Sequence, residues 1–294
     1  MATHAREAAV DYAPSSPIVR DNAGHTPVVS IIIVNYETKG LLKYCLRRLF
    51  ASALPEHTEV IVIDNASSDG SAAWAEREAA NRNDLVVIAN SKNTGFGAGN
   101  NEGIRRAKGK YCFIMNPDIV VREGALQRLV AFLEAHPKAA AVGPRLTHPD
   151  GTLQDSRFRF PGVMIPLYRR TPLGHFAFAR REINHYCMAD INHHAPHTVD
   201  WLLGAAILVR RDAITRVGLM DERYFLYFED IDWCRRFWKE GYEVWYEPNA
   251  MLTHFHQRLS AEATGLNTLF SFATRVHIAS GIKYFLKWGI NNYV

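Results

Sequence analysis

The sequence has few cysteines and no long apolar run, and each shortage excludes a class of protein. Its four cysteines among 294 residues contain no Cys-x-x-Cys pair. We therefore expect a reducing compartment, with neither a disulfide framework nor a zinc site. The best apolar run, residues 201–209, is far shorter than the roughly 20 residues that span a bilayer. The chain is not expected to be an integral membrane protein.

The sequence also lacks a large excess of either positive or negative charge. The net charge is +4, and lysine and arginine are not gathered into one basic stripe, so a nucleic-acid partner is not expected. Residues 1–27 mix charge, proline and small residues without the apolar core of a signal peptide. We expect them to form a disordered tail. The rest has the ordinary composition of a globular protein, with 48% hydrophobic and 22% charged residues.

Apolar runs alternate with helical patterns as far as residue 146. This alternation predicts an α/β fold with a mostly parallel sheet flanked by helices. We expect strands at residues 28–36, 58–64, 85–89, 111–115, 139–143 and 200–209, and helices at residues 39–53, 71–82, 98–108, 123–136 and 212–217. Residues 147–199 lose the periodicity, so loops and short helices that shape a substrate cleft are expected there.

Polar side chains end three of the predicted strands. Asn35 and Asp64 close two of them, and the strand at residues 111–115 runs into Asn116 and Asp118. The carboxyl edge of an open α/β sheet is where ligands bind. A carboxylate beside an amide suits a hard divalent cation that holds a diphosphate.

A glycine-rich segment, Asn-Thr-Gly-Phe-Gly-Ala-Gly-Asn-Asn, occupies residues 93–101. We expect it to form a turn that leads into a helix, where the backbone approaches a ligand closely. It lacks the Gly-Lys-Ser/Thr of a P-loop.

Four segments in this order resemble the signature of family 2 glycosyltransferases, and most closely the rhamnosyltransferase-like branch. They are Ser-Ile-Ile-Ile-Val-Asn-Tyr, Val-Ile-Asp-Asn-Ala-Ser-Ser-Asp-Gly, the glycine-rich segment and Asn-Pro-Asp. The resemblance covers residues 28–289. It implies a GT-A fold with a catalytic domain at 28–256, whose donor half is 28–146 and whose acceptor half is 147–256. A helical extension at 257–294 would follow.

The acidic segment Phe-Glu-Asp-Ile-Asp-Trp places Glu229 and Asp230 at the start of a predicted helix. The helix dipole stabilises carboxylates there as anions. An acceptor hydroxyl must lose its proton as it attacks the anomeric carbon, and a fixed carboxylate is the usual base. The resemblance implies that Asp230 is this base and that Glu229 orients the acceptor. The alternative is that both acids only cap and solubilise the helix.

The resemblance also implies the donor, metal and acceptor contacts. The metal would be Mg²⁺ or Mn²⁺ on Asp118, assisted by Asn116 and completed by His254, with His256 as a competing choice. The chain departs from an Asp-x-Asp arrangement, because Asn116 brings no charge. Trp201 and Gly204 would form the acceptor floor. The nucleotide sugar would contact Asn35, Tyr36, Asp64, Asn65, Asn93, Gly95, Phe96, Gly99, Asn100 and Asn116.

Two segments have two interpretations each. Six arginines interleaved with aromatic residues suit either anionic lipid or a diphosphate acceptor, or else an ordinary solvated loop; they are Arg157, Arg159, Arg169, Arg170, Arg180 and Arg181. Residues 266–290 alternate aromatic, basic and apolar residues at helical spacing. That segment predicts either an interfacial helix or a helix that packs on the catalytic domain.

The predicted function is inverting transfer of L-rhamnose from dTDP-L-rhamnose to a saccharide or polyprenyl-diphosphate-linked acceptor, in cell-surface polysaccharide biosynthesis. The expected location is the cytoplasm, with peripheral contact at the inner membrane. A sugar nucleotidyltransferase is the nearest enzymatic alternative, but residues 35–38 lack its basic glycine-rich loop. A catalytically inactive carbohydrate-binding scaffold of the same fold is the other alternative, because Asn116 replaces an acid.

Overall fold

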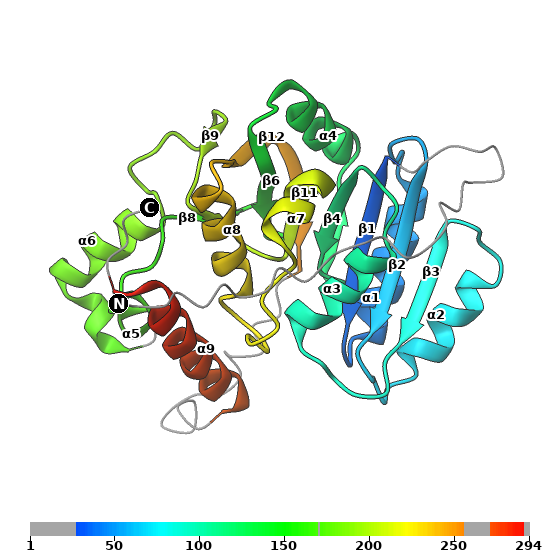
Figure 1. The fold of residues 1–294 in the computed structure, drawn as a ribbon, viewed down its shortest axis with the longest axis horizontal. Helices are drawn as coiled ribbons and strands as arrows, with labels where there is room; N and C mark the ends of the chain where they lie inside the picture. The colour runs from blue at the N-terminus through cyan, green and yellow to red at the C-terminus, as the bar shows by residue number, and fades with distance from the viewer. Residues whose placement is uncertain (1–27, 170, 256–270, 291–294) are drawn as a thin grey trace, which may run out of the picture.

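A computed structural model of the chain describes residues 28–169, 171–255 and 271–290 (Figure 1). The predicted tail at 1–27, the histidine His256 and part of the predicted C-terminal extension lie outside the described residues.

A ten-stranded mixed sheet forms the centre of the molecule, in the order β3-β2-β1-β4-β11-β6-β12-β5, with β7 beside β6 and β9 beside β12. Most of its long strands run parallel, while β11 is antiparallel to both β4 and β6, and β5 is antiparallel to β12. The strands are β1 (Val29–Asn35), β2 (Thr58–Asp64), β3 (Leu85–Ala89), β4 (Tyr111–Met115), β5 (Ile119–Val121), β6 (Ala139–Thr147), β7 (Leu153–Gln154), β9 (His197–Thr198), β11 (Ala206–Arg210) and β12 (Glu243–His254). The mostly parallel α/β prediction is confirmed.

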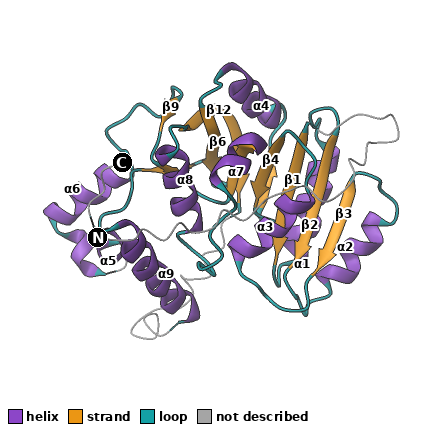
Figure 2. Cartoon of the chain, viewed as in Figure 1, coloured by secondary structure: helices purple, strands orange, loops and turns teal. Residues whose placement is uncertain are grey.

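Helices cover both faces of this sheet (Figure 2). One core lies under α1 (Lys39–Ala51), α2 (Ser71–Ala79) and α4 (Ala125–Ala135). The other lies under α3 (Phe96–Arg106), α7 (Arg211–Val217) and α8 (Glu229–Lys239). Adjacent β1 residues Ile31 and Ile32 are fully buried in opposite cores. Coverage of both faces explains why the central strands are continuous apolar runs rather than alternating ones.

The strand predicted at residues 200–209 is wrong, because the structure divides it. β10 (Trp201–Leu202) pairs with β8 (Arg157–Phe158) in a separate two-stranded sheet, and β11 begins only at Ala206. Between them, the backbone N–H of Gly204 donates to the Asp230 carboxylate instead of joining a ladder. A side-chain acceptor thus replaces strand pairing at the break.

The glycine-rich segment is helical earlier than predicted. α3 begins at Phe96, two residues before the predicted start at 98, so Gly97 also lies inside the helix. Gly95 is the N-cap, with φ of 90°, and a Cβ there would lie 2.3 Å from the Phe225 carbonyl oxygen. Only glycine accommodates both that φ and that contact.

The irregular region and the chain's end lie together at one end of the molecule (Figure 1). Residues 147–199 contain α5 (Ile165–Tyr168), the 3₁₀ helix η1 (Pro172–His175) and α6 (Ala177–Tyr186), which confirms the expectation of loops and short helices. α9 (Phe272–Trp288) packs beside α8. Across the three described ranges, no helix has the length and apolarity needed to cross a bilayer.

Candidate active site

The tips of β1 and β2 are joined by a buried polar pair. Asn35 and Asp64 are register partners, and Asn35 Nδ2 donates to Asp64 Oδ1 at 2.8 Å. The other carboxylate oxygen accepts the backbone N–H of Ser67 at 2.9 Å. Both side chains are buried, whereas Tyr36 beside them is about half-exposed. Asn35 and Asp64 therefore hold the edge in shape, and the Tyr36 ring is the accessible side chain beside them; its contact with a nucleotide stays a prediction.

Asn65 ties the end of β2 to the loop before α3. Its Nδ2 donates to Asn93 Oδ1 at 3.0 Å and to the Gly95 carbonyl at 3.1 Å. Its Oδ1 accepts from the backbone N–H of Thr94. One buried amide thus hydrogen-bonds both sides of the loop and stabilises its conformation.

Asn100 lies one turn into α3. Its Nδ2 donates to the Phe96 carbonyl at 2.9 Å, while its buried Oδ1 accepts no hydrogen bond from any residue that the structure describes. A buried acceptor without a partner carries a free-energy cost. Within the glycine-rich segment, the Oδ1 atom of Asn100 is thus able to accept a further hydrogen bond.

α8 begins with the two predicted catalytic acids. The residues before it, Tyr227 and Phe228, have φ of 68° and 70°. Left-handed backbone at non-glycine residues is strained and collects at functional sites. Its effect here is to turn Glu229 and Asp230 into the first turn of the helix, where the dipole favours anions.

Asp230 is held rigidly by two backbone donors. Gly204 N–H donates to Oδ2 and Ile231 N–H donates to Oδ1, both at 2.9 Å. Burial raises the pKa of Asp230 to about 6, although these hydrogen bonds act in the opposite direction. The carboxylate is therefore mostly ionised at neutral pH and basic enough to accept a proton.

The pKa of Glu229 is also raised. Burial and the neighbouring charge of Asp230 raise the pKa of Glu229 well above its usual value. Its Oε2 is buried and has no hydrogen-bond partner within the described ranges. We infer a neutral Glu229 beside an anionic Asp230, which is how environment separates the roles of two adjacent carboxyl groups.

Three predicted motifs meet at this pair. A Cβ at Gly204 would lie 3.2 Å from Asp230 Oδ2 and 3.3 Å from Phe96 Cε1, and one at Gly97 would lie 3.5 Å from Glu229 Cβ. The glycine-rich segment, the predicted acceptor floor and the acidic segment are therefore in contact.

Trp201, the other predicted acceptor residue, is a core side chain in this structure. Its ring stacks on Phe158 at 4.5 Å between centroids, and its indole N–H donates to the Arg159 carbonyl at 2.9 Å. Trp201 therefore packs in the core beside the predicted acceptor floor. Its contact with an acceptor stays a prediction.

Asp118 and His254 face each other beyond the ends of β4 and β12. Asp118 Oδ1 lies 3.1 Å from His254 Nε2, and His254 Nδ1 lies 2.8 Å from Gln154 Oε1. Because that amide oxygen accepts, Nδ1 carries a proton, and Nε2 is the ring nitrogen that faces Asp118. Adjacent ligands about 2.1 Å from an octahedral cation lie about 3 Å apart. The pair fits two positions of a divalent cation.

Asn116 enters this corner through its backbone. Its N–H donates to the Ala205 carbonyl at 2.9 Å, next to Gly204. No group of three or more histidine, cysteine or acidic side chains that could hold a metal occurs in the described part of the chain. Asp118 and His254 would therefore supply few of the ligands, and a bound diphosphate and water would supply the others.

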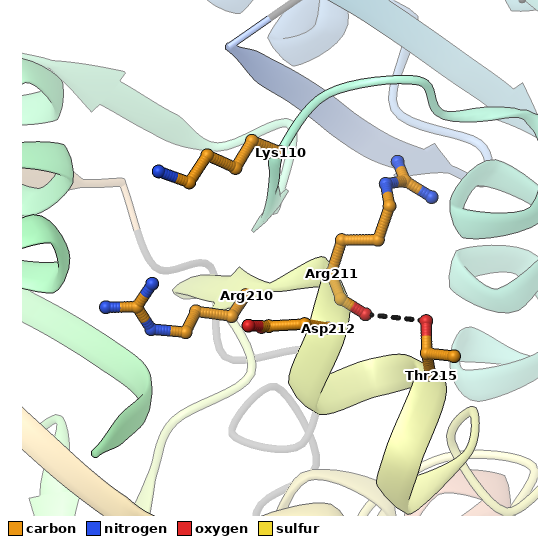
Figure 3. A pocket seen from close by; sticks show the side chains of 5 residues that line it. All are labelled: Lys110, Arg210, Arg211, Asp212 and Thr215. Atoms are coloured by element: carbon orange, nitrogen blue, oxygen red, sulfur yellow. Dashed lines mark hydrogen bonds between the residues drawn. The ribbon is translucent and has the colours of Figure 1, made fainter. Parts of the chain in front are cut away.

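A cleft of about 350 Å³ lies away from these residues (Figure 3). It is lined by Lys110, Arg210, Arg211, Asp212 and Thr215. Arg210 donates to the carbonyls of Leu133 and His136 at the end of α4, and Arg211 donates to the Gly109 carbonyl at 2.6 Å. These cations hold the fold together, so we place no chemistry in this cleft.

The sequence analysis missed three residues of the site. Gln154 orients His254, Phe225 closes over Gly95, and Gly97 makes room for Glu229. The aromatic run at residues 224–228, next to the acidic pair, was a signal for Phe225. Nothing in the sequence near Gln154 marks it.

Comparison with known proteins places these residues in a family context. The family model described as "Glycosyl transferase family 2" matches residues 30–214. N-acetylglucosaminyl-diphospho-decaprenol L-rhamnosyltransferase of Mycobacterium tuberculosis is 28% identical over 248 residues, covering 78% of this chain and 76% of that protein. Rhamnosyltransferase WbbL of Escherichia coli K12 is 28% identical over 264 residues, covering 87% of this chain and 92% of that protein.

Solved structures share the fold at lower identity. The mannosyltransferase PcManGT from Pyrobaculum calidifontis, in complex with GDP-Man and Mn²⁺, has a TM-score of 0.57 at 16% identity, over 94% of this chain and 76% of that one. GalNAc-T7 with UDP, GalNAc and Mn²⁺ has a TM-score of 0.62 at 15% identity, over 80% of this chain and 44% of that one. These similarities confirm the GT-A architecture.

Proposed function

The chain belongs to glycosyl transferase family 2 and is a glycosyltransferase, and we propose that it moves L-rhamnose from dTDP-L-rhamnose to a saccharide on a polyprenyl diphosphate. Transfer would be a single inverting displacement. The sugar and the lipid-linked acceptor come from the names of the two rhamnosyltransferases that resemble this chain. The observation that carries the mechanism is the Glu229–Asp230 pair at the first turn of α8.

Asp230 acts as the general base in this proposal. Its carboxylate is fixed by Gly204 and Ile231, so it loses little freedom when an acceptor hydroxyl binds. A pKa of about 6 keeps it ionised at neutral pH while raising its basicity above that of a solvated aspartate. The acceptor proton moves to Asp230 as the hydroxyl oxygen attacks the anomeric carbon.

Glu229 positions substrate rather than accepting the proton. As a neutral acid, it can donate a hydrogen bond from its carboxyl group to a sugar oxygen. Its buried Oε2 has no hydrogen-bond partner among the described residues, so a hydrogen bond to the sugar would satisfy it. Gly97, packed against the Glu229 side chain, keeps the glycine-rich segment close to this hydrogen bond.

Tyr36, Asn65, Asn100 and the loop before α3 would hold the nucleotide sugar. Asp118 and His254 would hold Mg²⁺ or Mn²⁺, with Gln154 fixing the imidazole. A bound cation supplies Lewis-acid stabilisation of the departing nucleoside diphosphate. The Mn²⁺ in both related structures supports a divalent cation without identifying which one this chain uses.

The experiment is a panel of nucleotide sugars, each tested for binding and slow hydrolysis with and without Mg²⁺ or Mn²⁺. Wild type is compared with Asp118→Ala, Asp230→Asn and the matched control Asp84→Asn on the opposite edge of the sheet. We expect metal-dependent binding of dTDP-L-rhamnose, weakened by Asp118→Ala, and loss of turnover but not binding in Asp230→Asn. Preference for another donor would overturn the rhamnose assignment, and full turnover in Asp230→Asn would overturn the base.

A further inference from the structure

α9 has one face that is fixed to the catalytic helix. Lys287 Nζ lies 2.8 Å from Asp232 Oδ1, and Trp288 Nε1 donates to the same oxygen at 2.7 Å. Arg235 donates to the Tyr284 hydroxyl at 3.0 Å, and a Cβ at Gly281 would lie 3.3 Å from the Phe228 ring. α9 therefore packs on α8 and on the residue that immediately precedes Glu229.

The opposite face of α9 is apolar and exposed. Ile278, Ile282, Leu286 and the following Ile290 are between 52% and 81% exposed. They recur at four-residue intervals, so they form one stripe along the helix. A continuous apolar stripe on the surface marks an interaction site rather than scattered exposure.

A second apolar group lies beside the C-terminal end of α9. It spans the described residues 163–178 and comprises Val163, Met164, Leu167, Leu173, Phe176 and Phe178, each between 40% and 57% exposed. Beneath the surface, the buried guanidinium of Arg235 lies 5.1 Å from the Phe160 ring and 4.9 Å from the Trp288 ring, so the segment before α5 packs near the end of α9. Figure 1 shows α5, α6 and α9 gathered at the same end of the molecule. We call these two groups together the α6–α9 surface.

The charge of the α6–α9 surface is mostly positive, with Glu182 on α6 as an exposed acid beside it. Neither residues 163–181 nor residues 271–290 contain an aspartate or glutamate. Arg169, Arg180 and Arg181 are exposed on the first stretch, and Arg275 and Lys283 are exposed on α9. Apolar side chains flanked mainly by cations match the interface of an anionic bilayer.

Two arginines of the predicted basic cluster do not contribute to this surface. Arg157 is fully buried, with its guanidinium 4.9 Å from the Tyr246 ring. Arg159 forms a 2.8 Å ion pair with Asp190. Arg170 lies outside the described residues. The sequence cluster is therefore divided between the interior and the surface.

We propose that the α6–α9 surface docks on an anionic phospholipid bilayer. This inference rests on the proposed function, since a polyprenyl-diphosphate acceptor lies at such a surface. The stripe would insert at the headgroup boundary while the arginines and lysines contact lipid phosphates. Because the inner face of α9 holds Phe228 and Asp232, docking fixes the orientation of α8, and hence of Asp230, relative to the membrane. The two interpretations of residues 266–290 are then the two faces of one helix.

The test is flotation of the full chain with phosphatidylcholine vesicles that contain or lack phosphatidylglycerol. Ile282→Asp/Leu286→Asp is compared with Ala51→Asp/Ala80→Asp, which adds the same charge on α1 and after α2. Arg180→Glu/Arg181→Glu is compared with Arg47→Glu/Arg77→Glu in the same way. We expect wild type and both controls to bind the anionic vesicles, and each surface variant to bind about tenfold or more weakly.

Three results would overturn the proposal. They are equal binding to both vesicle types, equal loss in the matched controls, and a wild-type dimer without lipid that Ile282→Asp/Leu286→Asp converts to monomer. The last result would assign the stripe to a second copy of the chain. Transfer to a water-soluble acceptor without a lipid tail separates this inference from the proposed function, because Ile282→Asp/Leu286→Asp should retain that activity. No transfer by wild type would instead count against the function.

Discussion

The backbone N–H of Gly204 donates to Oδ2 of Asp230 at 2.9 Å, across 26 positions of the chain. The same hydrogen bond divides the strand predicted at residues 200–209 and orients the carboxylate at the start of α8. The irregular backbone at Gly204 and the rigidity of Asp230 are thus one feature of the structure.

Replacing Gly204 tests this relationship. In Gly204→Ala the N–H remains, but the new Cβ would lie 3.2 Å from Asp230 Oδ2 and 3.3 Å from Phe96 Cε1. We expect turnover to fall at saturating donor, with a stability loss of about 1–3 kcal/mol from overpacking. Steady-state kinetics and chemical denaturation measure the two effects. Gly40→Ala, where a Cβ meets nothing within 4 Å, is the control and should not lose activity. Unchanged turnover in Gly204→Ala would contradict the tight fit.

The two acids should respond differently to amide substitution. Asp230→Asn removes the base and should lower kcat about 10²–10⁴-fold. Glu229→Gln replaces a neutral acid by a neutral amide that can still donate a hydrogen bond, so it should retain much more activity. Both kcat values are measured with the same donor and acceptor. A larger loss in Glu229→Gln than in Asp230→Asn would reverse the assignment of roles.

Turnover should follow the ionisation of Asp230. Because burial raises its pKa to about 6, kcat should decline as the pH falls through that value. A pH profile from about 4.5 to about 8 brackets this pKa and measures the acidic limb. The Asp84→Asn control should reproduce the wild-type limb. A limb centred near the ordinary aspartate pKa would show that Asp230 is solvated or is not the base.

The same raised pKa destabilises the folded state at neutral pH. Folding raises the pKa of Asp230 from 3.8 to about 6, so its stabilising contribution is complete below the unfolded value and is lost as the pH rises through the folded one. The stability of Asp230→Asn relative to wild type should therefore increase between acidic and neutral pH, by about 3 kcal/mol. Denaturant unfolding at several pH values measures the increase. A difference independent of pH would contradict the burial.

Gln154 should affect metal binding without touching the metal. Its Oε1 accepts from His254 Nδ1 at 2.8 Å, and loss of such an orienting partner typically weakens metal affinity about 10–100-fold. We expect Gln154→Leu to weaken Mn²⁺-dependent binding of the nucleoside diphosphate by that factor. Titration calorimetry measures this affinity. Gln127→Leu is the control, because the Gln127 side chain donates to the Ala53 carbonyl, just after α1. Equal affinities in the two variants would exclude the proposed metal position.

Asp232 should make the largest polar contribution to the packing of α9 on α8. It is fully buried and accepts from Arg236, Lys287 and Trp288 at 2.7–3.0 Å. Asp232→Ala removes the acceptor of the Trp288 indole N–H, while Lys287 keeps its ion pair with Asp221, so we expect it to cost about 1–3 kcal/mol of unfolding free energy. Asp190→Ala, in an exposed pair with Arg159, should cost less than about 1 kcal/mol. Similar costs would show that α9 is not held through Asp232.

Local patterns in the sequence predicted most elements of the fold. β-branched runs predicted β1 and β2, and helical periodicity predicted α1 and α4, because both signals depend on neighbours within a few residues. The start of α3 was predicted two residues too late, since the glycines at its beginning suggested a turn. The glycines are required instead by packing, as Gly99 lies against Val34 on β1 and a Cβ there would come within 3.1 Å of it.

By itself, the sequence determined strands β1 to β4, their polar edge and the acidic start of α8, but not the long strand β12. These follow from short-range pattern and from the chemistry of Asp118, Glu229 and Asp230. Only the tertiary structure decided that burial raises the pKa values of both Glu229 and Asp230, that Gln154 orients His254 and that one face of α9 stays exposed. The physical reason is that burial, desolvation and hydrogen bonding between distant segments exist only once the chain has packed, and no local pattern encodes them.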